Sequence, residues 1–232
     1  MTAILERPAP AVAEALTRRR LDGGIDALRS DLIRMMDLAR YMLKDAMTAL
    51  HTGDTGLAES VIERDAEVDE LDRCIETRAI CLVGTQQPVA YDLRFVGTVL
   101  KVTTDVERIG DHAVNIARVV IRLMKCPGQM PVPVETERMG TIALELLRAT
   151  AESFANDDAV TAQTVIERDD ELDILYRETQ TELRHRMIES PPRSVAASHL
   201  LFVAHYLERV GDHCANAAER LDYLVTGRVP YG

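Results

Sequence analysis

Apolar residues recur every three to four positions along most of the chain, which is the spacing of one face of an α-helix. In the first half this pattern predicts three long helices, over about residues 24–52, 54–84 and 90–125. Gly53-Asp54 interrupts the first two, and Asp54 or Thr55 is placed to cap the second. The first half is therefore expected to form three antiparallel helices joined by short turns.

The same pattern returns after a proline-rich break, where three prolines fall within the eight residues 126–133 and cannot continue a helix. Three further helices are predicted, over about residues 134–154, 158–189 and 194–226. No stretch has the alternating pattern of a strand. The predicted fold is all-α, a tandem repeat of two three-helix bundles. The expected divisions are a flexible N-terminal arm (1–20), a first bundle (21–126), a linker (127–133) and a second bundle (134–227).

An internal duplication supports this division. Residues 107–117 read ERIGDHAVNIA and residues 208–218 read ERVGDHCANAA, identical at seven of eleven positions. Residues 61–69 and 165–173 repeat in the same order, as VIERDAEVD and VIERDDELD. The two blocks shift by 101 and 104 residues. A loop between the second and third helix of each bundle can absorb that difference, whereas a helix interior cannot without rotating its faces.

The duplicated blocks carry pairs of carboxylates four residues apart, which places both members of a pair on one helix face. The pairs are Asp65/Asp69, Glu107/Asp111, Asp169/Asp173 and Glu208/Asp212. Like charges at this spacing repel, so a bound cation is the expected reason for keeping them. Oxygen ligands suit hard or borderline cations such as Mg²⁺, Mn²⁺, Ca²⁺ or iron. The alternative is a solvated surface in which the acids pair with neighbouring arginines: Arg64, Arg108, Arg168 and Arg209.

Other residues of the duplicated blocks have structural interpretations. His112 and His213 lie about 100° around the helix from the neighbouring aspartates, and we expect them to make hydrogen bonds rather than to ligate a metal. Gly110 and Gly211 each cost about 1 kcal/mol in a helix relative to Ala. Close approach of a neighbouring helix is the expected reason for them.

Composition restricts the class of protein. The net charge of −11 argues against binding to nucleic acid or to anionic lipid. The four cysteines form no C-x-x-C pair, which indicates free thiols in a reducing compartment. The N-terminal residues lack a secretory signal, and no run approaches the roughly 20 apolar residues of a membrane span. A cytoplasmic protein without direct membrane insertion is expected.

Several of these motifs together resemble the PhoU family of phosphate-uptake regulators. They are DLRFV at residues 92–96, KVTTDVERIGDHA at 101–113, NIA at 115–117 and LFVAHYLERVGDH at 201–213. The resemblance covers roughly residues 20 to 226. It implies two three-helix bundles and metal binding through the four carboxylate pairs, with iron, manganese, magnesium or zinc as possible metals.

The resemblance also implies a function. It suggests a cytoplasmic, non-enzymatic negative regulator of phosphate uptake and of the phosphate-starvation response. The implied partners are the cytoplasmic subunits of a phosphate ABC transporter, a phosphate-sensing histidine kinase and a second copy of the chain, at the inner membrane. Two alternatives stay open: a carboxylate-bridged metalloenzyme, a hydrolase or oxidase, and a structural helical scaffold. Against the enzyme, the chain has one E-x-x-H motif where a di-iron site needs two.

Overall fold

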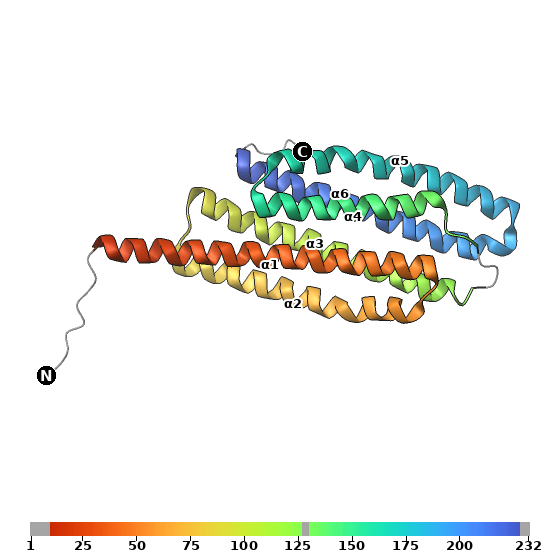
Figure 1. The fold of residues 1–232 in the computed structure, drawn as a ribbon, viewed down its shortest axis with the longest axis horizontal. Helices are drawn as coiled ribbons and strands as arrows, with labels where there is room; N and C mark the ends of the chain where they lie inside the picture. Colours follow the sequence, from red (N-terminus) through yellow and green to blue (C-terminus); the bar gives the residue numbers. More distant parts are fainter. Residues whose placement is uncertain (1–9, 127–129, 228–232) are drawn as a thin grey trace.

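The computed structural model describes residues 10–126 and 130–227, with side chains described from residue 18 onward. Helices make up nearly all of this part of the chain, and it contains no strand, so the predicted all-α fold is confirmed (Figure 1). The helices are α1 (Pro10–Thr52), α2 (Thr55–Gln86), α3 (Ala90–Leu123), α4 (Val134–Asn156), α5 (Ala159–Glu189), η1 (Pro191–Arg193) and α6 (Ser194–Thr226). None of these helices is both long and apolar enough to cross a membrane.

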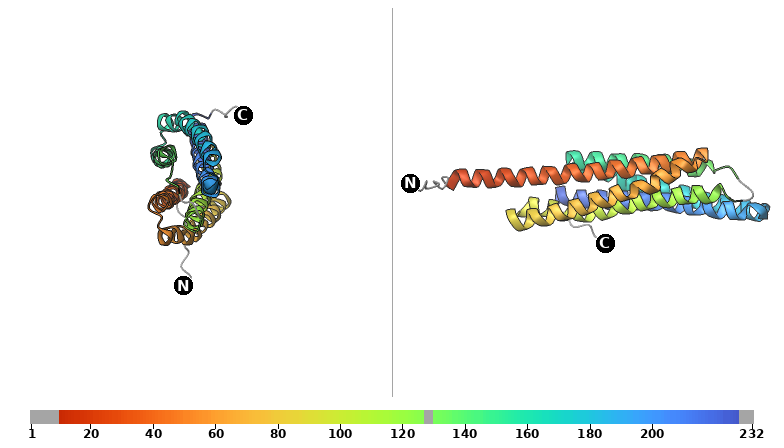
Figure 2. Two further views of the ribbon diagram at one scale, coloured as in Figure 1. Left: turned by 90° about the vertical axis from the view of Figure 1, so that its right-hand side faces the viewer. Right: turned by 90° about the horizontal axis from the view of Figure 1, so that it is seen from below.

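The six long helices form two three-helix bundles that lie side by side (Figures 1 and 2). Helices α1, α2 and α3 pack on one another, and so do α4, α5 and α6. Between the bundles, α1 packs on α4 and α3 packs on α6. Among the described helices, α2 contacts only α1 and α3. Among the long ones, α5 contacts only α4 and α6, so α2 and α5 lie on the two outer sides.

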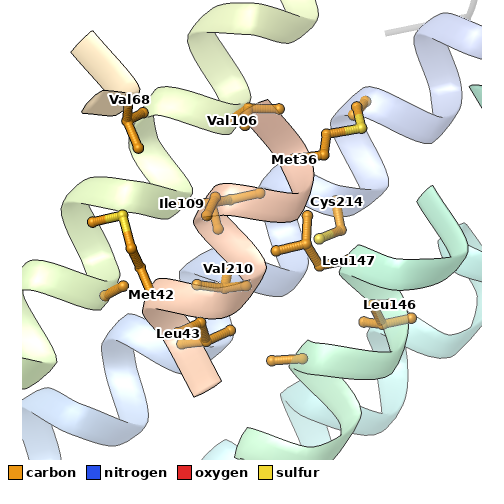
Figure 3. Close-up of a cluster of buried hydrophobic side chains, with 14 of the residues drawn as sticks. Met36, Met42, Leu43, Val68, Val106, Ile109, Leu146, Leu147, Val210 and Cys214 are labelled. Carbon is orange, nitrogen blue, oxygen red and sulfur yellow. The ribbon is translucent and has the colours of Figure 1, made fainter. Parts of the chain in front are cut away.

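One hydrophobic core continues through both bundles (Figure 3). Met36 of α1, Ile109 of α3, Leu147 of α4 and Val210 of α6 all belong to it and are at most 1% exposed. Burying each such side chain stabilises the fold by about 1.5–3 kcal/mol. Because residues from both repeats share one core, the two bundles are expected to unfold together.

Helix α1 begins earlier than the sequence indicated. It starts at Pro10, so residues 10–20 of the expected arm are helical, and residues 1–9 lie outside the described part. Proline is favoured at the first position of a helix, and the alanines that follow it are strong helix formers. Gly24 lies inside α1 rather than at its start. It allows α2 to approach closely, since a Cβ at residue 24 would lie 2.4 Å from Leu82 Cδ1 of α2.

The turns follow the predicted signals more closely. Asp54 caps α2, where its side chain accepts a hydrogen bond from the backbone N–H of Leu57 at 3.0 Å. Asp158 caps α5 in the corresponding place of the second bundle. Helix α3 ends at Leu123 and α4 begins at Val134, with Pro133 at its N-cap. The middle of the predicted linker, residues 127–129, lies outside the described residues.

Candidate functional site

The four carboxylate pairs are brought together as two groups of four. We call Asp65, Asp69, Glu107 and Asp111 the first acidic face, and Asp169, Asp173, Glu208 and Asp212 the second acidic face. The first lies between α2 and α3, and the second between α5 and α6. Charges interact across each helix pair, because Asp111 of α3 raises the pKa of Asp65 of α2. Asp212 of α6 likewise raises the pKa of Asp169 of α5.

Asp169 is the most perturbed carboxyl group of the second acidic face. Burial, followed by the charges of Asp212, Asp173 and Glu208, raises its pKa from 3.8 to about 7. Its position depends on a glycine, since a Cβ at residue 211 would lie 2.3 Å from Asp169 Oδ1. Gly211 therefore allows this carboxylate to lie against the backbone of α6, as expected for a glycine at a close approach.

The first acidic face is less tightly packed. A Cβ at Gly110 would first meet Val68 Cγ1, at 3.4 Å, which is close to an ordinary contact. Burial is again the main cause that raises the pKa of Asp65 and of Glu107, followed by Asp69 for Asp65 and Asp111 for Glu107. The two repeats thus share a charge arrangement but differ in how closely the helices enclose it.

Glu208 has a buried carboxylate oxygen, Oε2, that lacks a hydrogen-bond donor among the described residues. His205 Nδ1 lies 3.5 Å from it, too far for a hydrogen bond of normal geometry. A buried carboxylate oxygen without a donor is costly, and a coordinated cation would satisfy it. The donor chemistry of this face therefore fits a metal ion.

Only two of the four arginines next to the carboxylate pairs form ion pairs with an acidic face, as a solvated surface without metal would require. Arg108 Nη1 lies 3.1 Å from Asp111 Oδ2, and Arg209 pairs with Asp212 in the same way. The other two arginines turn toward the first helix of their own bundle. Arg64 contacts Asp45 of α1 at 2.7 Å, and Arg168 contacts Glu145 of α4 at 2.9 Å, so neither neutralises an acidic face.

One acidic residue of this region was missed by the sequence reasoning. Asp72 lies three residues after Asp69, and its negative charge helps to raise the pKa of Glu107. The spacing of seven residues from Asp65 carried the signal, because i, i+4 and i+7 share one helix face. The corresponding residue of the second repeat is Tyr176, whose ring centroid lies 6.1 Å from that of His205. At this position the first face therefore has a further carboxylate, where the second has an aromatic ring.

The two histidines lie between the bundles, in the contact of α3 with α6. His213 Nδ1 lies 3.1 Å from Asp105 Oδ1, so the expected hydrogen bond is present there. For His112 the expectation is wrong, because its Nδ1 is buried without a partner in the described residues. Its ring stacks on those of His213 and Tyr206, with centroids 5.6 and 5.7 Å apart. Burial, followed by the charge of His213, lowers the pKa of His112 to about 4.

Metal binding would require side chains of each face to move. Within the described residues, no three His, Cys, Asp or Glu side chains are already grouped tightly enough to hold one ion. The carboxylates of each face are nevertheless close enough to raise one another's pKa. The carboxylates are at least partly exposed, so their side chains can rotate, and a cation would replace their repulsion with attraction. All eight predicted residues remain candidate ligands.

Comparison with known proteins identifies both repeats. The PhoU domain family matches residues 32–120 and 136–221. A relative from Clostridium acetobutylicum, named a phosphate-specific transport system accessory protein PhoU homolog, is 35% identical over 92% of this chain and 97% of its own length. A relative of the same name from Aquifex aeolicus is 36% identical over 88% of this chain and 92% of its own length.

Solved structures agree with the fold. The crystal structure of PhoU from Pseudomonas aeruginosa superposes with a TM-score of 0.85 at 32% identity, covering 89% of this chain and 99% of that one. The phosphate transport system regulatory protein PhoU from Streptococcus pneumoniae gives a TM-score of 0.82 at 27% identity, covering 90% and 98%. The duplicated helical bundles are therefore shared over nearly the whole length of both structures.

Proposed function

The chain belongs to the PhoU family, and from this membership and its two acidic faces we propose that it is a metal-dependent negative regulator of phosphate uptake. Its relatives are named accessory proteins of phosphate transport, and the family is regulatory rather than enzymatic, which confirms the expectation of a non-enzymatic protein. A role in the regulation of phosphate transport follows. The sign of that regulation and its dependence on metal are the proposal.

We propose that the protein acts in the cytoplasm as an adaptor at the inner membrane. Its partners would be the cytoplasmic subunits of a phosphate ABC transporter and a phosphate-sensing histidine kinase. The net charge of −11 supports docking to basic partner surfaces. A second copy of the chain is the third proposed partner, as the family resemblance implies.

The observation that carries the metal part of the proposal is the second acidic face. Four carboxylates lie on this face, Glu208 Oε2 lacks a hydrogen-bond donor among the described residues, and Asp169 lies against α6 with a raised pKa. Such a site destabilises the empty protein and is satisfied by a cation such as iron, Mn²⁺, Mg²⁺ or Zn²⁺. Metal binding would also reduce the local negative charge, and so favour one partner over another.

The test is expression of a phosphate-starvation reporter in a deletion strain of the native host, grown in high phosphate. Wild-type protein should restore repression. A variant with Asp65→Asn, Glu107→Gln, Asp169→Asn and Glu208→Gln should not. The control removes the same charge from exposed acids outside both faces, with Asp26→Asn, Glu59→Gln, Glu152→Gln and Glu178→Gln, and should repress normally.

Each result separates one part of the proposal. Repression by the acidic-face variant, at wild-type protein levels, would keep the regulator and remove the metal from its function. A deletion strain that represses the reporter normally would contradict the regulatory role itself. Loss of repression in the control as well would trace the effect to net charge rather than to the two faces.

A further inference from the structure

A basic pocket lies between α3 and α6, at the end where α3 begins and α6 ends. It has a volume of about 220 Å³ and is lined by Arg94, Gly97, Thr98 and Lys101 of α3 and by Arg220 and Tyr223 of α6. We propose that this pocket binds a small phosphate-type oxyanion. The site is separate from the acidic faces and does not depend on the function proposed for them.

The positive charges of this pocket are poorly matched by negative ones. Among the described residues, three cationic side chains line it and no carboxylate does, in a chain whose net charge is −11. Arg94 Nε is buried and donates to no described residue. The acidic contact at its edge is Asp105 Oδ2, 3.4 Å from Arg220 Nε, and the same carboxylate already accepts from His213. An anion in the pocket would supply the missing acceptors.

The arrangement fits a tetrahedral oxyanion better than a single carboxylate. Two guanidinium groups can each donate two parallel hydrogen bonds, and phosphate oxygens match that fork. The Lys101 ammonium adds a third positive charge, and the hydroxyl groups of Thr98 and Tyr223 add donors. A volume of about 220 Å³ holds a phosphate group with a few waters or a small organic remainder, because a water occupies roughly 30 Å³.

Gly97 keeps one wall of the pocket free of a side chain. A glycine inside a helix costs about 1 kcal/mol relative to Ala, and close packing usually explains it. Here packing does not, since a Cβ at residue 97 would meet nothing within 4 Å. The missing side chain leaves the pocket open.

The pocket is also not a by-product of the duplication. With the offset of 101 residues, Arg94 and Lys101 correspond to Val195 and Phe202 of α6. Those two side chains are apolar and about half exposed, at 52% and 53%. The fold itself therefore does not require cations at this position, and one of the two equivalent ends has acquired them.

The test is isothermal titration calorimetry on the full chain in chelator-treated buffer at constant ionic strength. The probes are inorganic phosphate, glycerol 3-phosphate as a phosphate ester and acetate as a carboxylate. Two variants test the pocket: Arg94→Gln with Lys101→Gln removes charge, and Gly97→Leu fills the space while keeping every charge. The control is Arg184→Gln, an exposed arginine of α5. Circular dichroism checks that each variant is folded.

We expect saturable binding of a phosphate probe, weakened about tenfold or more in both pocket variants and unchanged in Arg184→Gln. The acidic-face variant should bind as wild type, which separates this site from the metal-dependent function. The tighter of the two phosphate probes identifies the source of the anion. No saturable phosphate binding by the wild type, equal binding by both pocket variants, or tighter binding of acetate would each overturn the proposal.

Discussion

Replacing Asp169 with Asn should stabilise the metal-free protein at neutral pH. The carboxyl group lies against α6, and burial together with four neighbouring carboxylates raises its pKa from 3.8 to about 7. The folded structure disfavours the ionised form of Asp169, so ionisation of this side chain lowers the free energy of unfolding. The amide of Asn has nearly the same shape and carries no charge, so the substitution removes that effect.

The sign and the size follow from linkage between proton binding and folding. Because the pKa of Asp169 is higher in the folded than in the unfolded chain, the folded state holds more protons between pH 3.8 and about 7. Stability is therefore highest below that window and falls as pH rises through it. The full shift corresponds to roughly 4 kcal/mol, but the group is partly exposed, so solvent screening should leave about 1–2 kcal/mol.

The assay is urea denaturation of wild type and Asp169→Asn, with a chelator present, at pH 5 and at pH 8. The variant should be more stable than the wild type by about 1–2 kcal/mol at pH 8, and by clearly less at pH 5. Glu178→Gln, an exposed change on the same helix, should shift stability by no more than about 0.5 kcal/mol at either pH. An advantage of Asp169→Asn that does not grow with pH would refute the reasoning.

Two further substitutions test the packing around the site and between the bundles. Gly211→Ala should be less stable than Gly110→Ala by about 1–3 kcal/mol in the same assay, because the added Cβ would lie 2.3 Å from Asp169 Oδ1 only in the first; equal stabilities would contradict this. Arg29→Met should lower the free energy of unfolding by about 1–3 kcal/mol, since it removes two hydrogen bonds, of 2.8 and 3.0 Å, to Asp157 at the end of α4. The control is Arg184→Met, at an exposed arginine of α5. A smaller change for Arg29→Met than for this control would contradict a stabilising contact between Arg29 and Asp157.

Most of the fold could be predicted from local patterns, since amphipathic spacing and turn residues act within one helix and its neighbours along the chain. The pairing of the bundles could not. An apolar stripe shows which face of α1 is buried but not that α4 covers it. Gly24 illustrates the limit: by propensity it indicates a helix end, whereas the contact that explains it is Leu82, far away in the sequence.

The candidate site was predictable as far as helix geometry allows. The spacing of four residues and the duplication identified all eight carboxylates, because both are properties of the chain itself. The directions of Arg64 and Arg168 were not, since an acid on another helix of the bundle decides each one. The stacking of His112 on His213 likewise depends on the α3–α6 contact, which no local pattern encodes.

Metal binding at the two acidic faces is the central claim, and titration of the chelator-stripped protein tests it most directly. We would measure bound Mn²⁺ or Fe²⁺ by equilibrium dialysis, without oxygen for iron, in wild type and in two double variants. Asp65→Asn with Glu107→Gln should lose the ions of the first face and keep those of the second. Asp169→Asn with Glu208→Gln should do the reverse, and the combined variant should bind none tightly. Unchanged stoichiometry and affinity in the combined variant would contradict the account.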